Sequence, residues 1–341
     1  MDKIVLLGKT MPELKLLSEE LGLPKFAARQ IADWLYKKNV DSVEQMTNIS
    51  LANRNKIAER CVVGKSLPEN VMVSADGTKK YLFRVQDKFV EAVYIPEKDR
   101  ATLCVSSQVG CKMNCLFCMT GKQGFGCNLT SGEILNQMQA IPEFDKLTNV
   151  VFMGMGEPMD NVKNVLAALE IMTSDYGYAW SPKRVTVSTV GIVPGMREFL
   201  QKSSCHLAVS LHNPFPDERL AMMPIEKAYP IVDVLSEIKE YDFTGQRRGS
   251  FEYTMFKGKN DTPRHAAELK RLLDGLECRM NLIRFHAIPD VPLEGSSDGE
   301  IEKFQSELSK RGLLATIRKS RGEDIFAACG LLSTMKNNKE L

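Results

Sequence analysis

The amino-acid sequence predicts an α/β protein whose core is a partial (β/α)6 barrel, preceded by a small N-terminal helical domain and a β-hairpin extension. Three observations indicate this fold class. Strand-like and helix-like segments alternate from about residue 102 onward, which is typical of a parallel sheet. The first 60 or so residues place apolar side chains at helical spacing. Between these regions, Asp76-Gly77 marks a hairpin turn.

The N-terminal region, assigned to residues 1–65, is expected to be helical. Two segments, 12–21 and 26–36, carry apolar residues three and four positions apart, and Gly22 and Pro24 separate them. The second segment also has a basic edge. Pattern alone leaves two interpretations of this domain: a small helical unit with a solvated basic edge, or a docking surface for folded RNA.

The next region, assigned to residues 66–97, is expected to be a β extension. Apolar and polar residues alternate on both sides of Asp76-Gly77, and a further strand is predicted at Lys88–Ile95. This last strand carries Glu91. By pattern alone, a glutamate on a strand is more often part of a surface ion pair than of an active site.

The third region, assigned to residues 98–335, is expected to form the barrel. Strands are predicted at 102–106, 149–153, 184–188, 206–211, 250–256, 280–286 and 315–319, and helices at 131–140, 161–174, 194–202, 231–241, 262–273 and 298–310. In barrels of this kind the chemistry collects at the carboxyl ends of the strands.

Composition excludes some classes of function but does not identify one. The chain has 341 residues, 43% hydrophobic and 26% charged, with a net charge of +2. Any RNA contact must therefore come from a local basic patch. Nine cysteines with no secretory signal before them predict a cytoplasmic protein whose thiols serve metals or catalysis. No apolar run reaches the length of a membrane span.

The run CVSSQVGCKMNCLFCMTGKQGFGCNL contains the strongest chemical signal. Cys111, Cys115 and Cys118 follow the spacing C-x3-C-x2-C, with Phe117 before the last cysteine. Three thiolates on a [4Fe-4S] cluster leave one iron open to a small molecule. A structural zinc site is the alternative, but such sites usually need a fourth ligand and paired short spacings. The spacing resembles the cluster loop of radical S-adenosylmethionine (SAM) enzymes, whose open iron chelates SAM.

Polar residues at predicted strand ends are the candidate SAM contacts. GMGEP closes one strand and resembles the motif that binds the SAM amino group in these enzymes. Taken alone, the G-x-G of GMGEP could be a simple strand-to-helix turn, and each of the other candidates is more often a helix cap or a satisfied core group. The candidates are Gly156, Glu157, Ser188, Ser210, Leu211, His212 and His286.

Two further cysteines are candidates for catalysis. Cys104 lies seven residues before the cluster motif near a strand end, and Cys329 lies in RGEDIFAACG after the last predicted strand. A buried cysteine is often a small apolar filler. Pattern alone therefore leaves two interpretations open, a structural role and a catalytic pair.

Motifs along nearly the whole chain resemble the RlmN/Cfr family of radical SAM RNA methyltransferases. They are FAARQIADWLYKK, VEAVYIPE, RATLCVSSQVGC, TGKQGF, NVVFMGMGEP, RVTVSTVG, VSLHNP, EYTMF, NLI and RGEDIFAACG. The resemblance implies a radical SAM barrel and methylation of carbon 2 of an adenosine. It also implies that Cys329 carries the transferred methyl group, that Cys104 is its partner thiol and that Glu91 accepts a proton.

The mechanism that the resemblance implies uses two SAM molecules per turnover. One methylates Cys329, and the reduced cluster cleaves the other to a 5′-deoxyadenosyl radical, which takes a hydrogen from that methyl group. The methylene radical adds to adenine, and electron loss and proton removal follow. Attack by Cys104 on the Cys329 sulfur then releases methylated RNA and leaves a transient disulfide. Because the adenine must leave its stack, base flipping is expected.

The implied partners are 23S ribosomal RNA, in its peptidyl transferase centre, and tRNA, at the adenosine beside the anticodon. An electron donor such as flavodoxin or ferredoxin is also implied, and no membrane or DNA partner is expected. Basic residues near the predicted rim are candidate phosphate contacts. They are Lys112, Lys122, Arg247, Arg248, Arg284, Lys319 and Arg321.

Three rival functions and two departures from the family pattern accompany this prediction. The rivals are Cfr-like methylation of carbon 8, a non-catalytic RNA-binding protein with a zinc-stapled loop, and a radical SAM enzyme acting on protein or small molecules.

The family usually has arginine at the position of Cys127 and asparagine at that of His286. Cys127 is not expected to bind the cluster, because a fourth ligand would leave no iron for SAM.

Overall fold

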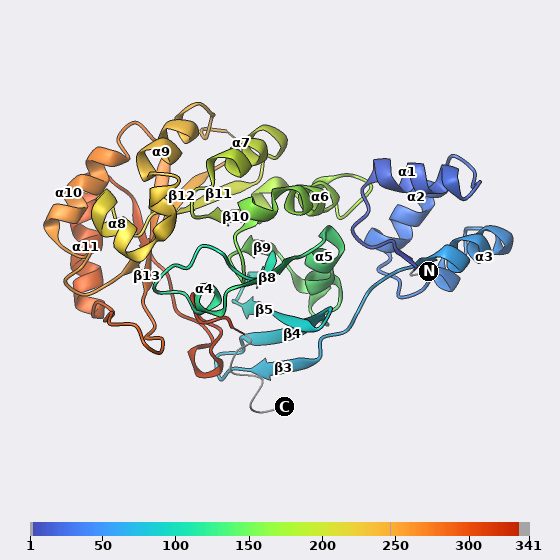
Figure 1. Ribbon diagram of the computed structural model, residues 1–341, viewed down its shortest axis with the longest axis horizontal. Coiled ribbons are helices and arrows are strands. Elements are labelled where there is room, and N and C mark those ends of the chain that lie inside the picture. Colours follow the sequence, from blue (N-terminus) through green and yellow to red (C-terminus); the bar gives the residue numbers. More distant parts are fainter. Residues whose placement is uncertain (1–2, 246, 334–341) are drawn as a thin grey trace.

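The computed structural model describes residues 3–245 and 247–333 (Figure 1). Its centre is a ten-stranded mixed sheet in the order β14-β13-β12-β11-β10-β9-β6-β5-β4-β3. Residues 1–2 of the expected helical domain and 334–335 of the expected barrel region lie outside the described residues. Within the described residues, no helix is long and apolar enough to cross a membrane.

The parallel part of the sheet forms the open barrel, and each neighbouring pair from β6 to β14 runs in the same direction. Its strands are rich in Val, Leu, Ile and Phe and are mostly buried, as expected for a sheet covered by helices. They are β6 (Ala101–Cys104), β9 (Asn149–Phe152), β10 (Val185–Thr189), β11 (His206–Ser210), β12 (Gly249–Met255), β13 (Cys278–Arg284) and β14 (Ala315–Ile317). Every strand predicted for this region is confirmed to within a few residues.

Helices pack on the outer side of the parallel strands, as Figure 1 shows for α6, α7, α9, α10 and α11. The long helices are α5 (Ser131–Gln139), α6 (Val162–Thr173), α7 (Val193–Lys202), α9 (Ile231–Lys239), α10 (Pro263–Leu272) and α11 (Asp298–Lys310). Local sequence fixes several of their starts. Thr130 and Glu133 form a capping box at α5, and Ser297 and Glu300 form another at α11.

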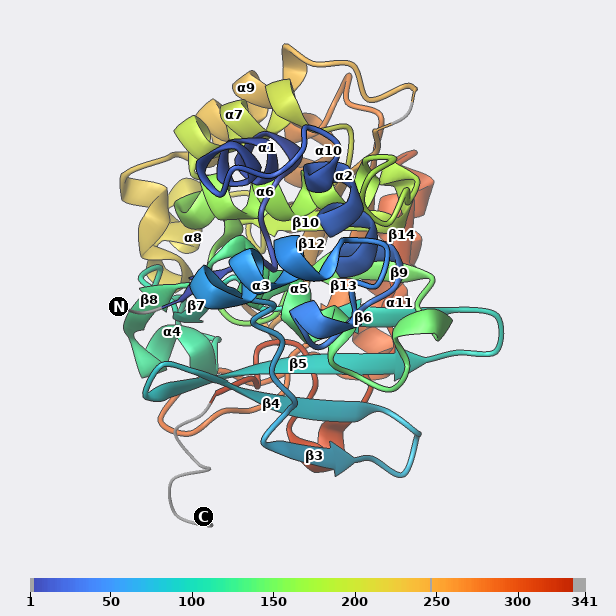
Figure 2. The same cartoon turned by 90° about the vertical axis from the view of Figure 1, so that its right-hand side faces the viewer.

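The hairpin strands continue the same sheet. β3 (Asn70–Val73), β4 (Lys79–Val85) and β5 (Lys88–Pro96) run antiparallel, and β5 pairs with β6 so that Val93 lies opposite Cys104. Figure 2 shows β3, β4 and β5 side by side below the helices. The predicted extension is therefore an edge of the barrel sheet, and it joins the sheet beside a candidate catalytic cysteine.

The N-terminal helices are α1 (Met11–Glu20), α2 (Ala27–Ala32) and α3 (Leu51–Arg60). The second is shorter than predicted, because it passes into a π-helical turn at Asp33–Lys37. A short parallel pair, β1 (Ile4–Val5) and β2 (Cys61–Val62), joins the two ends of this region. In Figure 1 the helices form a separate lobe beside the barrel.

Short elements without a clear sequence signal complete the fold. β7 (Gln108–Gly110) and β8 (Phe125–Asn128) form a small antiparallel sheet, with α4 (Met119–Gln123) between them in the chain. α8 (Pro216–Met222) follows β11. Turns of 3-10 helix lie at Val43–Gln45, Phe144–Lys146, Pro158–Asn161, Pro182–Arg184, Pro224–Lys227 and Glu323–Ile325.

Candidate active site

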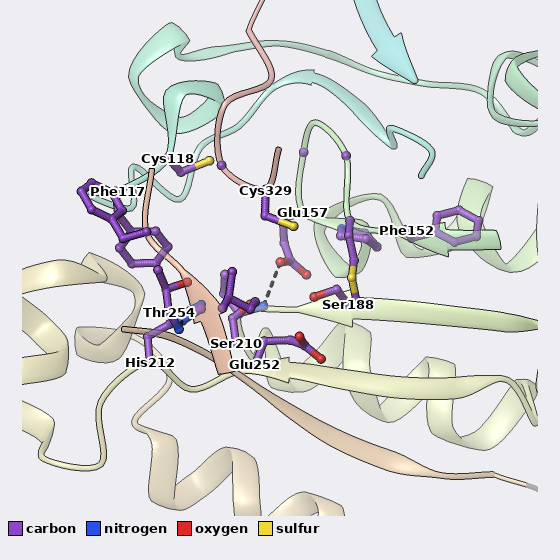
Figure 3. A pocket seen from close by; sticks show the side chains of 18 of the residues that line it. Phe117, Cys118, Phe152, Glu157, Ser188, Ser210, His212, Glu252, Thr254 and Cys329 are labelled. Atoms are coloured by element: carbon purple, nitrogen blue, oxygen red, sulfur yellow. Dashed lines mark hydrogen bonds between the residues drawn. The ribbon is translucent and has the colours of Figure 1, made fainter. Parts of the chain in front are cut away.

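A cavity of about 160 Å³ lies at the carboxyl ends of the barrel strands (Figure 3). Five strand ends and the loops that follow them form its wall. They contribute residues 152–154 and 156–158 from β9 and its loop, Ser188 and Val190 from β10 and its loop, Ser210 and His212 from β11 and its loop, Glu252 and Thr254 from β12, and residues 283–285 from β13 and its loop. Phe117 and Cys118 of the cysteine loop and Cys329 of the C-terminal loop close it. Segments far apart in the sequence thus meet at one site.

The cysteine loop is held in place by the β7–β8 sheet. Gly110 has a φ of 70°, and a Cβ added there would lie 1.7 Å from the Gly124 carbonyl oxygen, so this crossing requires glycine. The amide of Cys111 donates to that same carbonyl at 3.0 Å. The amide of Cys118 donates to the Cys115 carbonyl at 3.1 Å. Three thiols are therefore folded into one compact loop.

The electrostatics of these thiols fit a cationic iron–sulfur centre. Burial raises the pKa of Cys111 to about 12, and burial followed by the charges of Cys118 and Cys111 raises the pKa of Cys115 well above its usual value. Thiolates that repel one another in a buried site need a metal centre to hold them deprotonated. In residues 3–245 and 247–333, no three Cys, His, Asp or Glu residues lie close enough to surround a single metal ion.

Phe117 fixes the cysteine loop against the barrel. Its ring meets the ring of His212 edge-on at 4.7 Å between centroids and lies 5.4 Å from the ring of Phe256. Such tilted contacts are a favoured geometry for aromatic pairs. Phe117 therefore fixes the position of the neighbouring Cys118 at the cavity.

Glu157 is a buried carboxylate at the cavity wall (Figure 3). It accepts hydrogen bonds from the hydroxyl of Thr189 at 2.6 Å and from the amides of Val190 and Met159 at 2.9 and 3.0 Å. Burial raises the pKa of Glu157 to about 7, although these hydrogen bonds act in the opposite direction. A buried carboxylate of this kind is suited to an ammonium group, because a cation restores its charged form.

Among the other predicted SAM contacts, Gly156, Ser188, Ser210 and His212 also line the cavity. His212 has a φ of 55°, and its Nδ1 accepts from the Thr254 amide at 2.9 Å. Burial lowers the pKa of His212 to about 3, so its ring is neutral.

Leu211 and His286 do not belong to this lining. The Leu211 amide donates to the Glu252 carbonyl, and its own carbonyl accepts from Arg219. His286 follows the end of β13, where its Nε2 lies 3.0 Å from the hydroxyl of Ser320. Their expected contacts with SAM stay predictions.

The two candidate catalytic cysteines, Cys104 and Cys329, lie close enough for their charges to interact. Cys104 ends β6, and burial together with the charge of Cys329 raises its pKa to about 12. Cys329 is exposed because it faces the cavity, yet the protein around its thiol raises its pKa by desolvation. The positive charge of Arg318 opposes this increase in the pKa of both thiols but does not cancel it. Arg318 therefore lies close enough to Cys104 and Cys329 to influence the pKa of both thiols.

The loop that carries Cys329 rests on the cysteine loop. The Met119 amide donates to the Gly330 carbonyl at 2.9 Å, and the Thr120 hydroxyl donates to the Leu332 carbonyl at 2.7 Å. The cluster segment and the segment bearing the candidate methyl carrier are thus joined by direct hydrogen bonds.

Glu91 is buried behind this loop and is not one of the cavity-lining residues. Its carboxylate pairs with Lys80 at 3.0 Å and accepts from the Ser333 amide at 3.0 Å. The interpretation of Glu91 as a surface pair is wrong, because its side chain is 1% exposed.

Glu252 and Thr254 line the cavity but were not among the predicted site residues. Glu252 is 4% exposed, accepts from Asn281 at 2.7 Å and lies 4.0 Å from Arg318. A glutamate inside the apolar strand FEYTMF was the signal available in the sequence.

For two of the basic residues predicted at the cavity rim, the prediction is wrong. Arg247 and Arg248 precede β12, so they lie at the amino end of the strands, opposite the cavity. Arg247 donates to the carbonyls of Leu200 and Ser203, and these hydrogen bonds join it to the end of α7 and the residue that follows. Lys112 pairs with Asp160 at 2.8 Å on the cavity side.

Fold and site together define a radical SAM protein, and the comparisons agree. Residues 105–269 match the model of the Radical SAM superfamily, and residues 4–63 match the ribosomal RNA large subunit methyltransferase N-terminal domain. The chain is similar to a solved radical SAM methyltransferase from Sphaerobacter thermophilus, with 38% identity, a TM-score of 0.89 and 96% and 99% of the two chains covered.

Curated relatives specify the family. A probable dual-specificity RNA methyltransferase RlmN of Parabacteroides distasonis is 59% identical over 98% of each chain. The dual-specificity RNA methyltransferase RlmN of Syntrophus aciditrophicus is 42% identical over 98% of this chain and 97% of its own. The chain belongs to the RlmN family of radical SAM methyltransferases, whose cofactors are a [4Fe-4S] cluster and SAM.

Proposed function

We propose that this protein methylates carbon 2 of an adenosine in 23S ribosomal RNA and of an adenosine in tRNA. One observation carries the proposal: Cys329 lines the same cavity as Cys118 and Glu157, and the thiol of Cys104 lies within electrostatic reach of it. The relatives named dual-specificity RNA methyltransferase support both RNA substrates.

The chain offers a complete set of residues for its cofactors. Cys111, Cys115 and Cys118 would hold the cluster. Gly156, Glu157, Ser188, Ser210 and His212 would contact SAM, with Glu157 facing its ammonium group. When bound, the cluster and SAM supply the methyl group, a carbon radical that removes one of its hydrogen atoms, and a redox partner for the electron that the RNA adduct gives up.

The protein residues then act in order. The Cys329 thiolate accepts the methyl group, and after hydrogen loss its methylene carbon bonds to carbon 2 of the adenine. Glu91 takes the proton displaced from carbon 2. The Cys104 thiolate attacks the Cys329 sulfur, the bond from that sulfur to the methylene carbon breaks, and its electron pair gains a proton to complete the methyl group. The resulting disulfide is reduced before the next turnover.

The same proposal assigns the regions and the remaining partners. Residues 1–65 serve as the RNA-docking domain, 66–97 as a β extension and 98–335 as the radical SAM core with its catalytic loop. A flavodoxin or ferredoxin supplies the electron, and the protein acts in the cytoplasm.

The direct test is anaerobic methylation of 23S ribosomal RNA fragments and tRNA, followed by identification of the modified nucleoside. We expect 2-methyladenosine from both RNAs in wild type and none from Cys329→Ala. Methylation at carbon 8 would instead support the Cfr-like alternative. Cleavage of SAM without any RNA product would contradict both and point to another substrate class.

A further inference from the structure

One face of the β4–β5–β6 edge carries three functional side chains in two adjacent rows. Lys80 lies opposite Val93, which lies opposite Cys104, so these three residues share a face of the sheet. Glu91 is two residues from Val93 on the same strand and face. Lys80, Glu91 and Cys104 therefore form a patch on the sheet.

Lys80 gives the buried Glu91 carboxylate its countercharge. Their side chains are 7% and 1% exposed, and Nζ lies 3.0 Å from Oε1. A carboxylate that loses its buried cation is strongly disfavoured as an anion and takes up a proton instead. Loss of Lys80 would therefore favour protonation of Glu91, and a protonated Glu91 cannot accept another proton.

Lys80 also contacts the loop that bears Cys329. Its Nζ lies 3.5 Å from the carbonyl oxygen of Phe326, three residues before the cysteine. Glu91 reaches the other side of the cysteine through the Ser333 amide. The ion pair consequently touches the loop on both sides of the methyl-carrying residue.

Resting on the function proposed above, we propose that Lys80 is a positioning residue that keeps Glu91 ionised beside the Cys329 loop, so that Glu91 can take the adenine proton. Lys80 acts through Glu91 and does not touch substrate. Loss of its charge blocks proton removal, which follows carbon–carbon bond formation, and the covalent RNA–Cys329 adduct persists.

The experiment measures formation and decay of the covalent RNA–protein adduct in single-turnover reactions of the reconstituted, full-length enzyme. We expect Lys80→Met to methylate Cys329 and form the adduct, but to resolve it at least about tenfold more slowly than wild type. Lys80→Gln, which keeps a hydrogen-bond donor without the charge, should show the same slow decay. Because the two residues act through one step, Glu91→Gln with Lys80→Met should decay no more slowly than Glu91→Gln alone.

Lys79→Met is the matched control. Lys79 neighbours Lys80 on β4, points to the opposite face and pairs with Glu143 at 2.6 Å. Its variant loses a comparable ion pair and should resolve the adduct at the wild-type rate.

Two results would overturn the role of Lys80. One is wild-type adduct decay in both Lys80 variants, and the other is loss of Cys329 methylation with no adduct, which would indicate loop docking alone. Cys104→Ala separates this failure from that of the proposed function, because a variant lacking the resolving thiol must trap the adduct. If Cys104→Ala traps no adduct, the proposed function itself fails.

Discussion

Cys104 lies in surroundings that oppose the thiolate form that the proposed mechanism requires of it. Burial, the main cause, raises its pKa to about 12, and burial would persist once Cys329 had become the uncharged thioether of the proposed adduct. Below that pKa, the thiolate fraction rises tenfold per pH unit. We therefore expect wild-type adduct decay to accelerate about tenfold per unit between pH 7 and 9.

The measurement is the decay rate of preformed adduct after a pH jump. Cys104→Ser is the control, because its hydroxyl does not ionise in this range and its adduct should persist throughout. A wild-type decay rate that does not change between pH 7 and 9 would contradict thiolate attack as the limiting step.

Arg219 is a buried cation that holds together the strand ends around the cavity. Its side chain is fully buried, donates to the carbonyls of Val190, Ser210 and Leu211, and pairs with Glu226. Arg219→Met leaves the Glu226 charge buried without a countercharge, so we expect a loss of about 3–5 kcal/mol in unfolding free energy. Urea denaturation measures it.

Arg264→Met is the surface comparison for this prediction. Arg264 pairs with Glu218 at 2.7 Å but is 62% exposed, so its loss should change the unfolding free energy by about 1 kcal/mol at most. Equal effects of the two variants would contradict a special role for the buried cation.

At the residue scale, sequence identifies groups whose chemistry has few alternatives. Cys111, Cys115 and Cys118 could be predicted from spacing because their ligand role needs only a short loop. Glu252 could not, since its importance depends on β12 facing the cavity beside Arg318. Arg247 was predicted at the wrong end of β12 for a similar reason, because the two ends of a strand resemble each other in composition.

At the element scale, the turn between β3 and β4 is fastened to the loop that precedes Cys329. Asp324 accepts from the Ser74 hydroxyl at 2.6 Å, and Asp76 accepts from the Gly322 amide at 3.1 Å. The hairpin edge thus supports the loop that leads to Cys329 from outside the barrel.

Asp76 should make this contact depend on pH. Burial would raise its pKa, but hydrogen bonds from Thr78, Gly322 and Ser74 outweigh it and lower the pKa to about 2. A folded-state pKa below the unfolded value near 4 gives stability that is complete above about pH 4 and is lost as the pH falls toward 2. We expect Asp76→Asn to be less stable than wild type at pH 6, and the difference to shrink by pH 3.

Thermal unfolding of both proteins at each pH measures this difference. Asp99→Asn, at an exposed aspartate between β5 and β6, is the control and should match wild type at pH 6. A wild-type advantage over Asp76→Asn that stays constant from pH 6 to pH 3 would show that the Asp76 carboxylate does not hold the loop.

Long elements were predictable, and short ones beside the site were not. The barrel strands and outer helices have clear periodicity and capping residues. β7, β8 and α4 are three to five residues long, and their existence depends on Gly110 crossing closely over Gly124. α8 is only seven residues long, too short for periodicity to reveal.

At the scale of the whole molecule, the helical lobe and the barrel meet through two glycines. A Cβ added to Gly132 at the start of α5 would lie 2.4 Å from the Leu7 carbonyl oxygen, and one added to Gly8 would lie 2.1 Å from the Gly132 nitrogen. Arg29 and Asp175 add an exposed ion pair across the same boundary at 2.9 Å. Backbone contact therefore sets the spacing of the two parts.

Gly132→Ala should push the lobe away from the barrel. We expect overpacking to destabilise the protein by about 1–3 kcal/mol. In the proposed mechanism methylation of Cys329 needs only the barrel, so RNA methylation should fall more than methylation of Cys329. Urea denaturation and parallel assays of the two reactions measure these effects.

Gly299→Ala is the control, because Gly299 lies in α11 with open space around its Cβ position. It should be neutral or stabilise the protein by about 0.5–1 kcal/mol. Unchanged stability and RNA methylation in Gly132→Ala would contradict a fixed lobe.

The joining of the hairpin to the barrel could not be predicted from sequence. Alternation predicts strands, but the pairing of Val93 with Cys104 depends on contacts between separate segments. That pairing brings Lys80 and Glu91 to the side of the loop that bears Cys329, so the proposed role of Lys80 depends on it.

Covalent capture of RNA at Cys329 is the most direct test of methyl transfer through this cysteine. Cys104→Ala, purified without oxygen with its cluster intact, should carry RNA joined through a methylene group from Cys329 sulfur to carbon 2 of an adenosine, as mass spectrometry of the digested adduct would show. An iron-loaded variant without adduct, together with a wild type that methylates no adenosine in ribosomal RNA or tRNA, would contradict RNA methylation by this protein.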